Sequence, residues 1–455
     1  MKKFVIMGLD SAAPDLVFGK LQHRMPNMAN LAKQGVRGPL ASTDPPITIP
    51  AWMSMMTGQH PGQLGLYGFR HRKGFSYDDA WVASSASIRA KTLWEMVGEA
   101  GGKSCVVGVP PTYPPKPING WLVSCFITPD IQKEYTHPPE LKKEIQNLVG
   151  EYVPDVEFRV QDRSALLKAL YDMTEKHFTV IEHLMQEKPW EFFAFVEIGL
   201  DRVHHAFWKF FDSTHHLYTP GNPFQDAIPD YYAYLDKWIG RLLESIPKGT
   251  PVMVVSDHGA KAMKGAFCVN QWLASEGYLA LSQPKSVVPL SSSNVDWAKT
   301  KAWGWGGYYA RIFLNVKGRE ADGTIPPEKY EESRTELTER IAGIRGPGGE
   351  AWQTQIIRPE EVFDPCLGDV PDLMIYFDDL AWRSAGTVGH PGMYLPENDT
   401  GPDDAVHAKN GIYILSGLYE EPRWQPASIL SVAPTVLKAM GLKIPSNIRG
   451  EPLCR

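Results

Sequence analysis

Three predicted buried strands of this 455-residue chain each run into an aspartate. The apolar runs cover residues 3–9, 192–200 and 251–256, and the aspartates that follow them are Asp10, Asp201 and Asp257. In an open parallel sheet, ligands bind outside the carboxyl ends of the strands, so three such ends can converge on one place. A cluster of Asp and His is most simply a divalent-metal site.

Two histidines lie beside these aspartates at spacings that suit such a site. His205 lies four residues after Asp201, and on a helix this spacing puts both side chains on one face, whereas His204 points elsewhere. His258 directly follows Asp257, and the glycine after it permits a sharp turn that can aim both side chains at one point. Taken singly, these residues also fit plainer interpretations: a helix-start aspartate, an unrelated histidine or a solvated turn.

A third histidine is expected from the C-terminal part of the chain. His407 precedes the apolar run 412–415 and is preferred over His390, which lies in a Gly-His-Pro-Gly turn. The predicted metal ligands are Asp10, Asp201, His205, Asp257, His258 and His407. Six ligands exceed what one tetrahedral ion needs, so two ions are implied. Paired ions about 4 Å apart are a device of phosphoryl-transfer sites.

Thr48 is the candidate nucleophile. Pro50 suits the first turn of a helix, which places Thr48 at or just before a helix N-terminus. Free N–H groups and the helix dipole favour an anion such as phosphate there. A metal-coordinated threonine hydroxyl is acidified into a usable alkoxide. The alternative is that Thr48 only caps the helix.

The predicted elements alternate between helix and strand, as in α/β proteins. Helices are expected at 11–35, 91–100, 163–187, 230–246 and 427–440, a further strand at 104–108, and irregular Pro- or Gly-rich segments at 38–68 and 109–119. Residues 283–355 are polar with Gly-rich breaks and are interpreted as an inserted cap or subdomain. The length suits one large α/β domain with insertions, or two domains.

Composition narrows the class of protein. The net charge of −6 argues against a general nucleic-acid binder. We find no signal peptide and no run of about 18 apolar residues, so no membrane association is expected. The five cysteines are scattered without a CxxC pair, as is typical of reduced thiols in a cytoplasmic protein. The sequence does not indicate the oligomeric state.

Taken together, the motifs resemble the alkaline phosphatase superfamily, and within it the predicted phosphohydrolases and phosphomutases related to type I phosphodiesterases and nucleotide pyrophosphatases. The matching stretches are Gly8-Leu9-Asp10, Pro45 to Trp52 with Thr57-Gly58, Asp201 to His205, Ser256 to Gly259, His407 and Ala433 to Leu437. The resemblance implies an alkaline-phosphatase-like three-layer α/β sandwich with a central, mostly parallel sheet and an inserted cap, in a single catalytic domain of residues 1–455.

The resemblance also implies roles for the site residues. One ion would be held by Asp10, Thr48, Asp257 and His258, and the other by Asp201, His205 and His407. Thr48 would form a covalent phospho-threonine that water then hydrolyses. The metals would be zinc or manganese: His-rich ligation favours Zn²⁺, and the carboxylates keep Mn²⁺ open.

The chain departs from the family at one position. Nucleotide pyrophosphatases place Asn three residues after the nucleophilic threonine, where this chain has Ala51. Lys261, Lys264 or a backbone N–H after Thr48 could supply the missing donor. A sulfatase is not expected, because the segment around Thr48 contains neither the required Cys nor the required Arg.

Three functions therefore compete. The leading one is a two-metal hydrolase of a phosphodiester or nucleotide-like phosphate ester, acting on a small phosphorylated substrate. The second is a phosphomonoesterase or phosphomutase on the same scaffold, and the third is a non-catalytic binding protein. The aromatic residues 207–211 and 303–308 could line a substrate pocket, although clustered aromatics are core packing at least as often.

Overall fold

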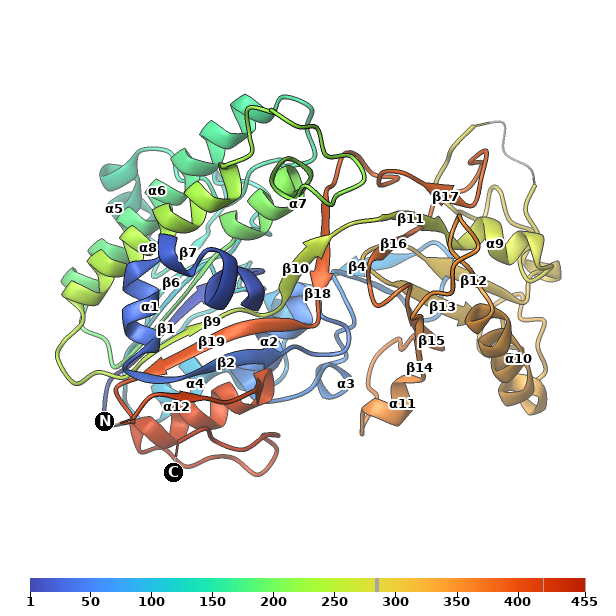
Figure 1. Ribbon diagram of the computed structural model, residues 1–455. Coiled ribbons are helices and arrows are strands. Elements are labelled where there is room, and N and C mark those ends of the chain that lie inside the picture. The colour runs from blue at the N-terminus through green and yellow to red at the C-terminus, as the bar shows by residue number, and fades with distance from the viewer. Residues whose placement is uncertain (283–285, 420, 455) are drawn as a thin grey trace.

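The computed structural model describes residues 1–282, 286–419 and 421–454, and it is built around one large sheet (Figure 1). Its strands are β1 (Phe4–Leu9), β2 (Gly35–Ala41), β5 (Ser104–Val107), β6 (Gly120–Val123), β7 (Thr136–His137), β8 (Phe192–Glu197), β9 (Val252–Val255), β19 (Asn410–Ser416), β20 (Arg423–Trp424) and β21 (Ala427–Ser428). Their order is β20-β2-β19-β9-β1-β8-β5-β6-β7, with β21 beside β2. Most neighbours are parallel, while β19 is antiparallel to both of its neighbours and β7 is antiparallel to β6.

Helices cover both faces of this sheet. On one face lie α1 (Pro26–Ala32), α5 (Glu140–Val149), α6 (Arg163–Glu187), α7 (Gly199–Phe211) and α8 (Ala227–Ser245), and on the other lie α2 (Thr48–Thr57), α4 (Leu93–Glu99) and α12 (Val432–Met440). Strand β1 shows why two layers are needed: Val5 and Met7 join one hydrophobic core, and Phe4 and Ile6 join the other. A strand that is apolar on both sides must be covered on both sides. The three-layer α/β sandwich is therefore confirmed.

A second body of structure packs beside the sheet, on the right of Figure 1. It contains α9 (Val269–Ser275), α10 (Tyr330–Ala342), α11 (Pro359–Val362), β11 (Gly265–Cys268), β12 (Ala302–Trp305), β13 (Ala310–Leu314), β14 (Gln355–Ile357), β15 (Leu373–Tyr376), β16 (Trp382–Ala385) and β17 (Tyr394–Leu395). Its own core runs from Phe267 to Trp382, a wider range than 283–355. Residues 283–285, with which the predicted insertion begins, lie outside the described residues.

The antiparallel pair β10 (Gly259–Ala262) and β18 (Ala405–Ala408) connects the two parts. Strand β10 follows β9 and leads into the second body, and β18 leads back from it into β19. Both connections lie at the carboxyl ends of the parallel strands. Two further elements, the hairpin β3 (Arg70–Arg72) with β4 (Ala80–Val82) and the short helix α3 (Pro61–Leu64), follow α2 in the chain.

The N-terminal quarter differs most from the predicted elements. Residues 11–35 do not form one helix but a π turn at Leu16–Lys20, a 3-10 turn at Gln22–Arg24 and the short helix α1. Pro26 explains the break, because proline lacks the N–H that would continue a helix and suits the first position of a new one. Residues 35–41, predicted mostly as loop, form strand β2.

No helix of the described residues is both long enough and apolar enough to cross a bilayer.

Candidate functional site

Asp10, Asp201 and Asp257 lie at the carboxyl ends of the adjacent parallel strands β1, β8 and β9. The last residue of β1 pairs with the last residue of β8, and the last residue of β9 pairs with the residue before it on β1, so the three strands end at one level. Asp10 directly follows β1, Asp257 lies in the turn after β9, and Asp201 lies in the first turn of α7. All three side chains are buried. The fold thus brings together the three aspartates that the strand pattern singled out.

Each aspartate has one oxygen held by a donor and one oxygen free. Trp52 Nε1 donates to Asp10 Oδ2 at 2.7 Å, the Ser11 N–H to Asp257 Oδ1 at 3.2 Å, and Arg202 Nη1 to Asp201 Oδ2 at 2.7 Å. Within the described residues, the other three oxygens, Asp10 Oδ1, Asp201 Oδ1 and Asp257 Oδ2, are buried without a hydrogen-bond partner. Buried carboxylate oxygens are stable only when they are paired or bind a metal. These three are fixed in place and fit a divalent cation.

The three predicted histidine ligands follow the same pattern. Their Nδ1 atoms contact oxygen acceptors: Asp403 Oδ1 at 2.7 Å from His205, Gly259 O at 3.0 Å from His258, and Pro46 O at 2.8 Å from His407. A proton on each Nδ1 therefore satisfies its acceptor and directs Nε2 towards the ligand cluster. His205 differs from the other two histidines, because against the effect of desolvation Asp403 and Asp201 raise its pKa well above the usual value. In each case the protein fixes both the tautomer and the direction of the ring.

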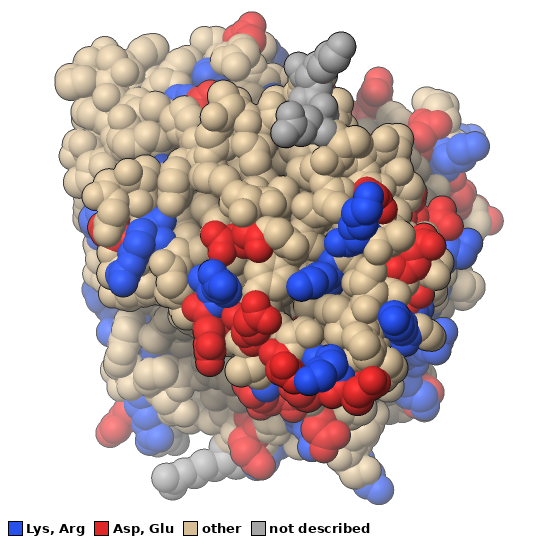
Figure 2. Space-filling view, turned by 90° about the vertical axis from the view of Figure 1, so that its right-hand side faces the viewer, with Lys and Arg blue, Asp and Glu red and all other residues tan. Residues whose placement is uncertain are grey.

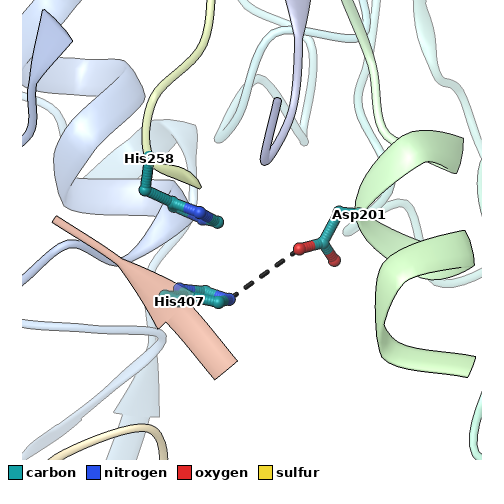
Figure 3. Close-up of side chains that lie close together, drawn as sticks. All are labelled: Asp201, His258 and His407. Atoms are coloured by element: carbon teal, nitrogen blue, oxygen red, sulfur yellow. Dashed lines mark ion pairs between the residues drawn. The ribbon is translucent and has the colours of Figure 1, made fainter. Parts of the chain in front are cut away.

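The ligand atoms form two overlapping groups. Asp10, Asp257 and His258 make one group, and Asp201, His258 and His407 make the other, with the atoms of each group within 4.8 Å of one another. Figure 3 shows the second group: the His258 and His407 rings lie parallel, and Asp201 faces them from α7. His258 therefore belongs to both groups, although the family resemblance assigned it to one ion only.

His205 adjoins the second group through Asp201. Its Nε2 lies 3.2 Å from Asp201 Oδ1, and the hydroxyl of Tyr308 lies 3.1 Å from the same nitrogen. The competing residue His390 lies elsewhere, with its Nε2 bonded to Thr387 Oγ1. The helical spacing of Asp201 and His205 thus places both side chains on one side of α7.

Burial and charge repulsion disfavour the charged forms of four of the ligands, whereas the pairing of Asp201 with His205 holds the pKa of Asp201 well below its usual value. Desolvation, reinforced by Asp201, raises the pKa of Asp10 well above its usual value, and desolvation reinforced by Asp10 does the same for the pKa of Asp257. Desolvation lowers the pKa of His258 to about 4 and holds that of His407 well below its usual value. Both imidazoles are therefore neutral near pH 7. Adjacent carboxylates with neutral nitrogens are the donor set of a divalent-metal site.

Thr48 is the first residue of α2, and its side chain points at this cluster. Its Oγ1 lies 3.4 Å from His258 Nε2. The N-cap of the helix is Ile47, and no side chain caps this terminus. Thr48 is therefore not the cap of its helix, and its hydroxyl is left to face the ligand atoms.

The first turn of α2 offers few free donors to an anion. Pro50 has no N–H, and the N–H of Ala51 donates to the Ile47 carbonyl at 2.9 Å. The N–H groups of Thr48 and Ile49 remain. The Lys264 ammonium is 2.8 Å from Asp378, and the Lys261 ammonium contacts Asp379. Three donors were expected to be able to replace the missing Asn. The two lysines bind acidic side chains, and the backbone N–H groups do not.

Sequence reasoning gave no role to three side chains that position the ligands: Trp52, Arg202 and Asp403. Asp403 lies four residues before His407, and this nearness could have marked it as part of the same site. Its contact with His205 depends on the fold. The ring of Tyr308, one of the aromatics considered for a pocket, stacks on His407 with centroids 3.8 Å apart. Trp52 lies on α2, Arg202 on α7, Tyr308 in the loop before β13 and Asp403 in the segment before β18.

Trp52→Phe tests whether the donor to Asp10 positions a metal ligand. The variant keeps an aromatic ring and removes only the N–H, and loss of such a contact typically lowers metal affinity about 10- to 100-fold. Trp94→Phe, in the same hydrophobic core, is the matched control. Titration with Zn²⁺ or Mn²⁺ measures both. Equal affinities in the two variants would show that the Trp52 contact has no such role.

Comparisons with known proteins identify the family and the fold of the chain. The model of the family described as type I phosphodiesterase/nucleotide pyrophosphatase matches residues 4–403. An inactive variant of murine ectonucleotide pyrophosphatase/phosphodiesterase 5, in complex with AMP, has a TM-score of 0.57 and 12% identity over 98% of this chain and 96% of that chain. Phosphonoacetate hydrolase from Sinorhizobium meliloti 1021, in complex with phosphonoformate, has a TM-score of 0.61 and 16% identity over 96% of each chain. No curated protein matches the sequence significantly. At these identities the solved structures establish a shared fold.

Proposed function

Because the chain belongs to the type I phosphodiesterase/nucleotide pyrophosphatase family of the alkaline phosphatase superfamily, we propose that this hydrolase cleaves a small phosphodiester or nucleotide-like phosphate ester through a covalent phospho-threonine at Thr48. The observation that carries the proposal is the common pattern of the six ligand side chains. Each has one polar atom tied to the protein and a second atom that faces the cluster beside Thr48, and His205 Nε2 also contacts Tyr308 and Asp201 there.

Two divalent cations fit this donor set. Asp10, Asp257 and His258 would hold one beside Thr48, and Asp201, His205 and His407 would hold the other, with His258 close to both. When bound, the cations would lower the pKa of the Thr48 hydroxyl and offset charge on the phosphoryl oxygens. The histidine share favours Zn²⁺, and the carboxylates leave Mn²⁺ open.

The residues then have distinct tasks in the proposed reaction. Thr48 Oγ1 releases its proton to solvent and forms a bond to phosphorus, while the ester oxygen departs with its bonding electrons. Water next attacks the phospho-threonine, and Thr48 Oγ1 leaves and takes up a proton from that water, which restores the free hydroxyl. The first-turn N–H groups of Thr48 and Ile49 point an electropositive helix end at the phosphoryl oxygens. Splitting one displacement into two easier ones is the purpose of a covalent intermediate.

A phosphomonoesterase, phosphomutase or phosphonate hydrolase on the same scaffold is the second candidate. Ala51 favours it, because the residue cannot supply the amide donor that nucleotide pyrophosphatases place there. Turnover of bis(p-nitrophenyl) phosphate, p-nitrophenyl phosphate and p-nitrophenyl phenylphosphonate separates these functions. The proposal expects the diester to have the highest kcat/KM. Preference for the monoester or the phosphonate would favour the second candidate.

A small substrate is also consistent with the surface. Figure 2 shows the face on the side of α9 and α10, where basic and acidic side chains are intermixed over the lower half. Mixed charge of this kind does not favour an extended polyanion on that face. The ligand cluster itself is buried, which suits a compact phosphorylated group.

Metal content provides a prediction from the two overlapping groups. Asp257→Ala and His205→Ala should each reduce bound metal from about two ions per chain to about one, because each residue serves one ion. His258→Ala should weaken the binding of both ions, since His258 lies in both groups. His390→Ala, outside the cluster, is the control and should retain the wild-type content. Elemental analysis after dialysis measures all four variants. Two retained ions in both single-ion variants would overturn the assignment.

A further inference from the structure

A cavity of about 370 Å³ adjoins the proposed site and is rich in arginine. Its basic lining residues are Arg70, Arg159, Arg202, Arg311 and Arg383, and no acidic residue is among the described residues that line it. Ile47, directly before Thr48, and Tyr308, whose hydroxyl is 3.1 Å from His205 Nε2, also line it. The cavity therefore opens next to both the candidate nucleophile and the second ligand group.

Three of these arginines have carboxylate partners. Arg202 binds both oxygens of Asp155, at 2.9 and 2.8 Å, and also Asp201. Arg159 and Arg383 share a single oxygen of Asp403, at 2.9 and 2.8 Å. Asp403 also bonds His205, so this one carboxylate serves two guanidinium groups and an imidazole.

The other two arginines lack a counter-charge. Among the described residues, neither Arg70 nor Arg311 forms an ion pair with a carboxylate, and the two are neighbours, since Arg311 Nη1 donates to the Arg70 carbonyl. The Nε atoms of Arg311 and Arg383 are buried and have no hydrogen-bond partner among the described residues. Arg383 is only 4% exposed. Unpaired buried donors and adjacent like charges are costly, and a bound anion offsets both.

We propose that this cavity binds a second anionic group of the substrate, a carboxylate or a phosphate, while the phosphorus that is attacked lies at Thr48. The guanidinium group is planar and presents paired donors that match the oxygens of either anion. The proposal rests on the proposed function and narrows its substrate class to small compounds with two anionic groups. In this proposal, the arginines that take no part in the hydrolytic steps recognise the substrate.

Calorimetric binding tests the proposal through affinities rather than through hydrolysis rates, so it stands apart from any failure of hydrolysis. The 455-residue protein, supplied with Zn²⁺ or Mn²⁺, is titrated with methylphosphonate, phosphonoacetate and methylenediphosphonate. Methylphosphonate lacks the second anionic group, phosphonoacetate adds a carboxylate, and methylenediphosphonate adds a phosphonate. At least one of the two larger ligands should bind about tenfold or more tightly than methylphosphonate, as expected for charge-assisted hydrogen bonds.

Arginine variants separate the cavity from simple chelation of the metals. Arg311→Gln and the exposed Arg70→Gln should each bring the ratio of affinities towards one. Arg70→Gln keeps the test valid if the partly buried Arg311 cannot be replaced without unfolding. Arg89→Gln is the control: Arg89 is an exposed arginine lining a separate cavity of about 820 Å³, and its variant should keep the wild-type ratio. Equal binding of all three ligands by the wild type, or an unchanged ratio in both Arg70→Gln and Arg311→Gln, would overturn the proposal. The more tightly bound of the two larger ligands identifies the second group as carboxylate or phosphate.

Discussion

Thr48→Ala is expected to lose hydrolysis almost entirely, with a fall in rate on the order of a thousandfold or more, while the fold and the bound metal remain. The hydroxyl makes no capping bond to its helix, and its Oγ1 faces His258 Nε2 at 3.4 Å. Removing it should therefore cost little stability, no more than the roughly 1 kcal/mol of a lost helix cap. Steady-state kinetics, thermal unfolding and metal content measure the three quantities separately.

Two further variants sharpen this test. Thr48→Ser retains a hydroxyl and should keep partial activity. Thr57→Ala removes a buried threonine at the other end of the same helix, where Oγ1 donates to the Met53 carbonyl at 2.6 Å. This control should leave hydrolysis unchanged. Near-normal turnover by Thr48→Ala with its metal bound would mean that water attacks phosphorus directly.

Removing the metal should abolish hydrolysis, and adding Zn²⁺ or Mn²⁺ should restore it. The physical reason is the set of three buried carboxylates whose second oxygens have no hydrogen-bond partner in the described residues and face histidine nitrogens instead. Chelation should also lower the unfolding temperature, because a ligand at about a thousand times its Kd stabilises the folded state by about 4 kcal/mol. Full turnover by protein shown to be free of metal would refute the metal-dependent account.

The strand-end aspartates could be predicted because their signal is local. Each follows a short apolar run, and parallel strands buried on both faces read as such runs without alternation. The long helix α6 was predicted with its observed bounds, 163–187, because its apolar residues recur at helical spacing. The convergence of Asp10, Asp201 and Asp257 then followed from a general property of parallel sheets.

Strand β2 could not be predicted because its glycines are required by partners distant in the sequence. A Cβ at Gly35 would lie 1.9 Å from the Leu415 carbonyl oxygen, and one at Gly38 would lie 2.4 Å from the Gln425 carbonyl oxygen. Read locally, these glycines and Pro39 indicate a loop. In the fold, the strand pairs along its whole length with β19.

The side chains that position the ligands could not be predicted from the sequence either. Asp403 orients His205 from 198 residues away, and Trp52 holds Asp10 from 42 residues away. The arginine-lined cavity combines side chains from near positions 70, 159, 202, 311 and 383, and no spacing in the sequence links them. Contacts of this kind exist only after segments distant in the sequence have packed together.

The stereochemical course at phosphorus tests the covalent mechanism most directly. Hydrolysis of a P-chiral p-nitrophenyl phosphorothioate diester in isotopically labelled water gives a product whose configuration can be assigned. Each in-line displacement inverts the configuration at phosphorus. Attack by Thr48 followed by attack of water on the phospho-threonine comprises two displacements, so net retention is expected. Net inversion would show a single direct attack by water and would contradict the role proposed for Thr48.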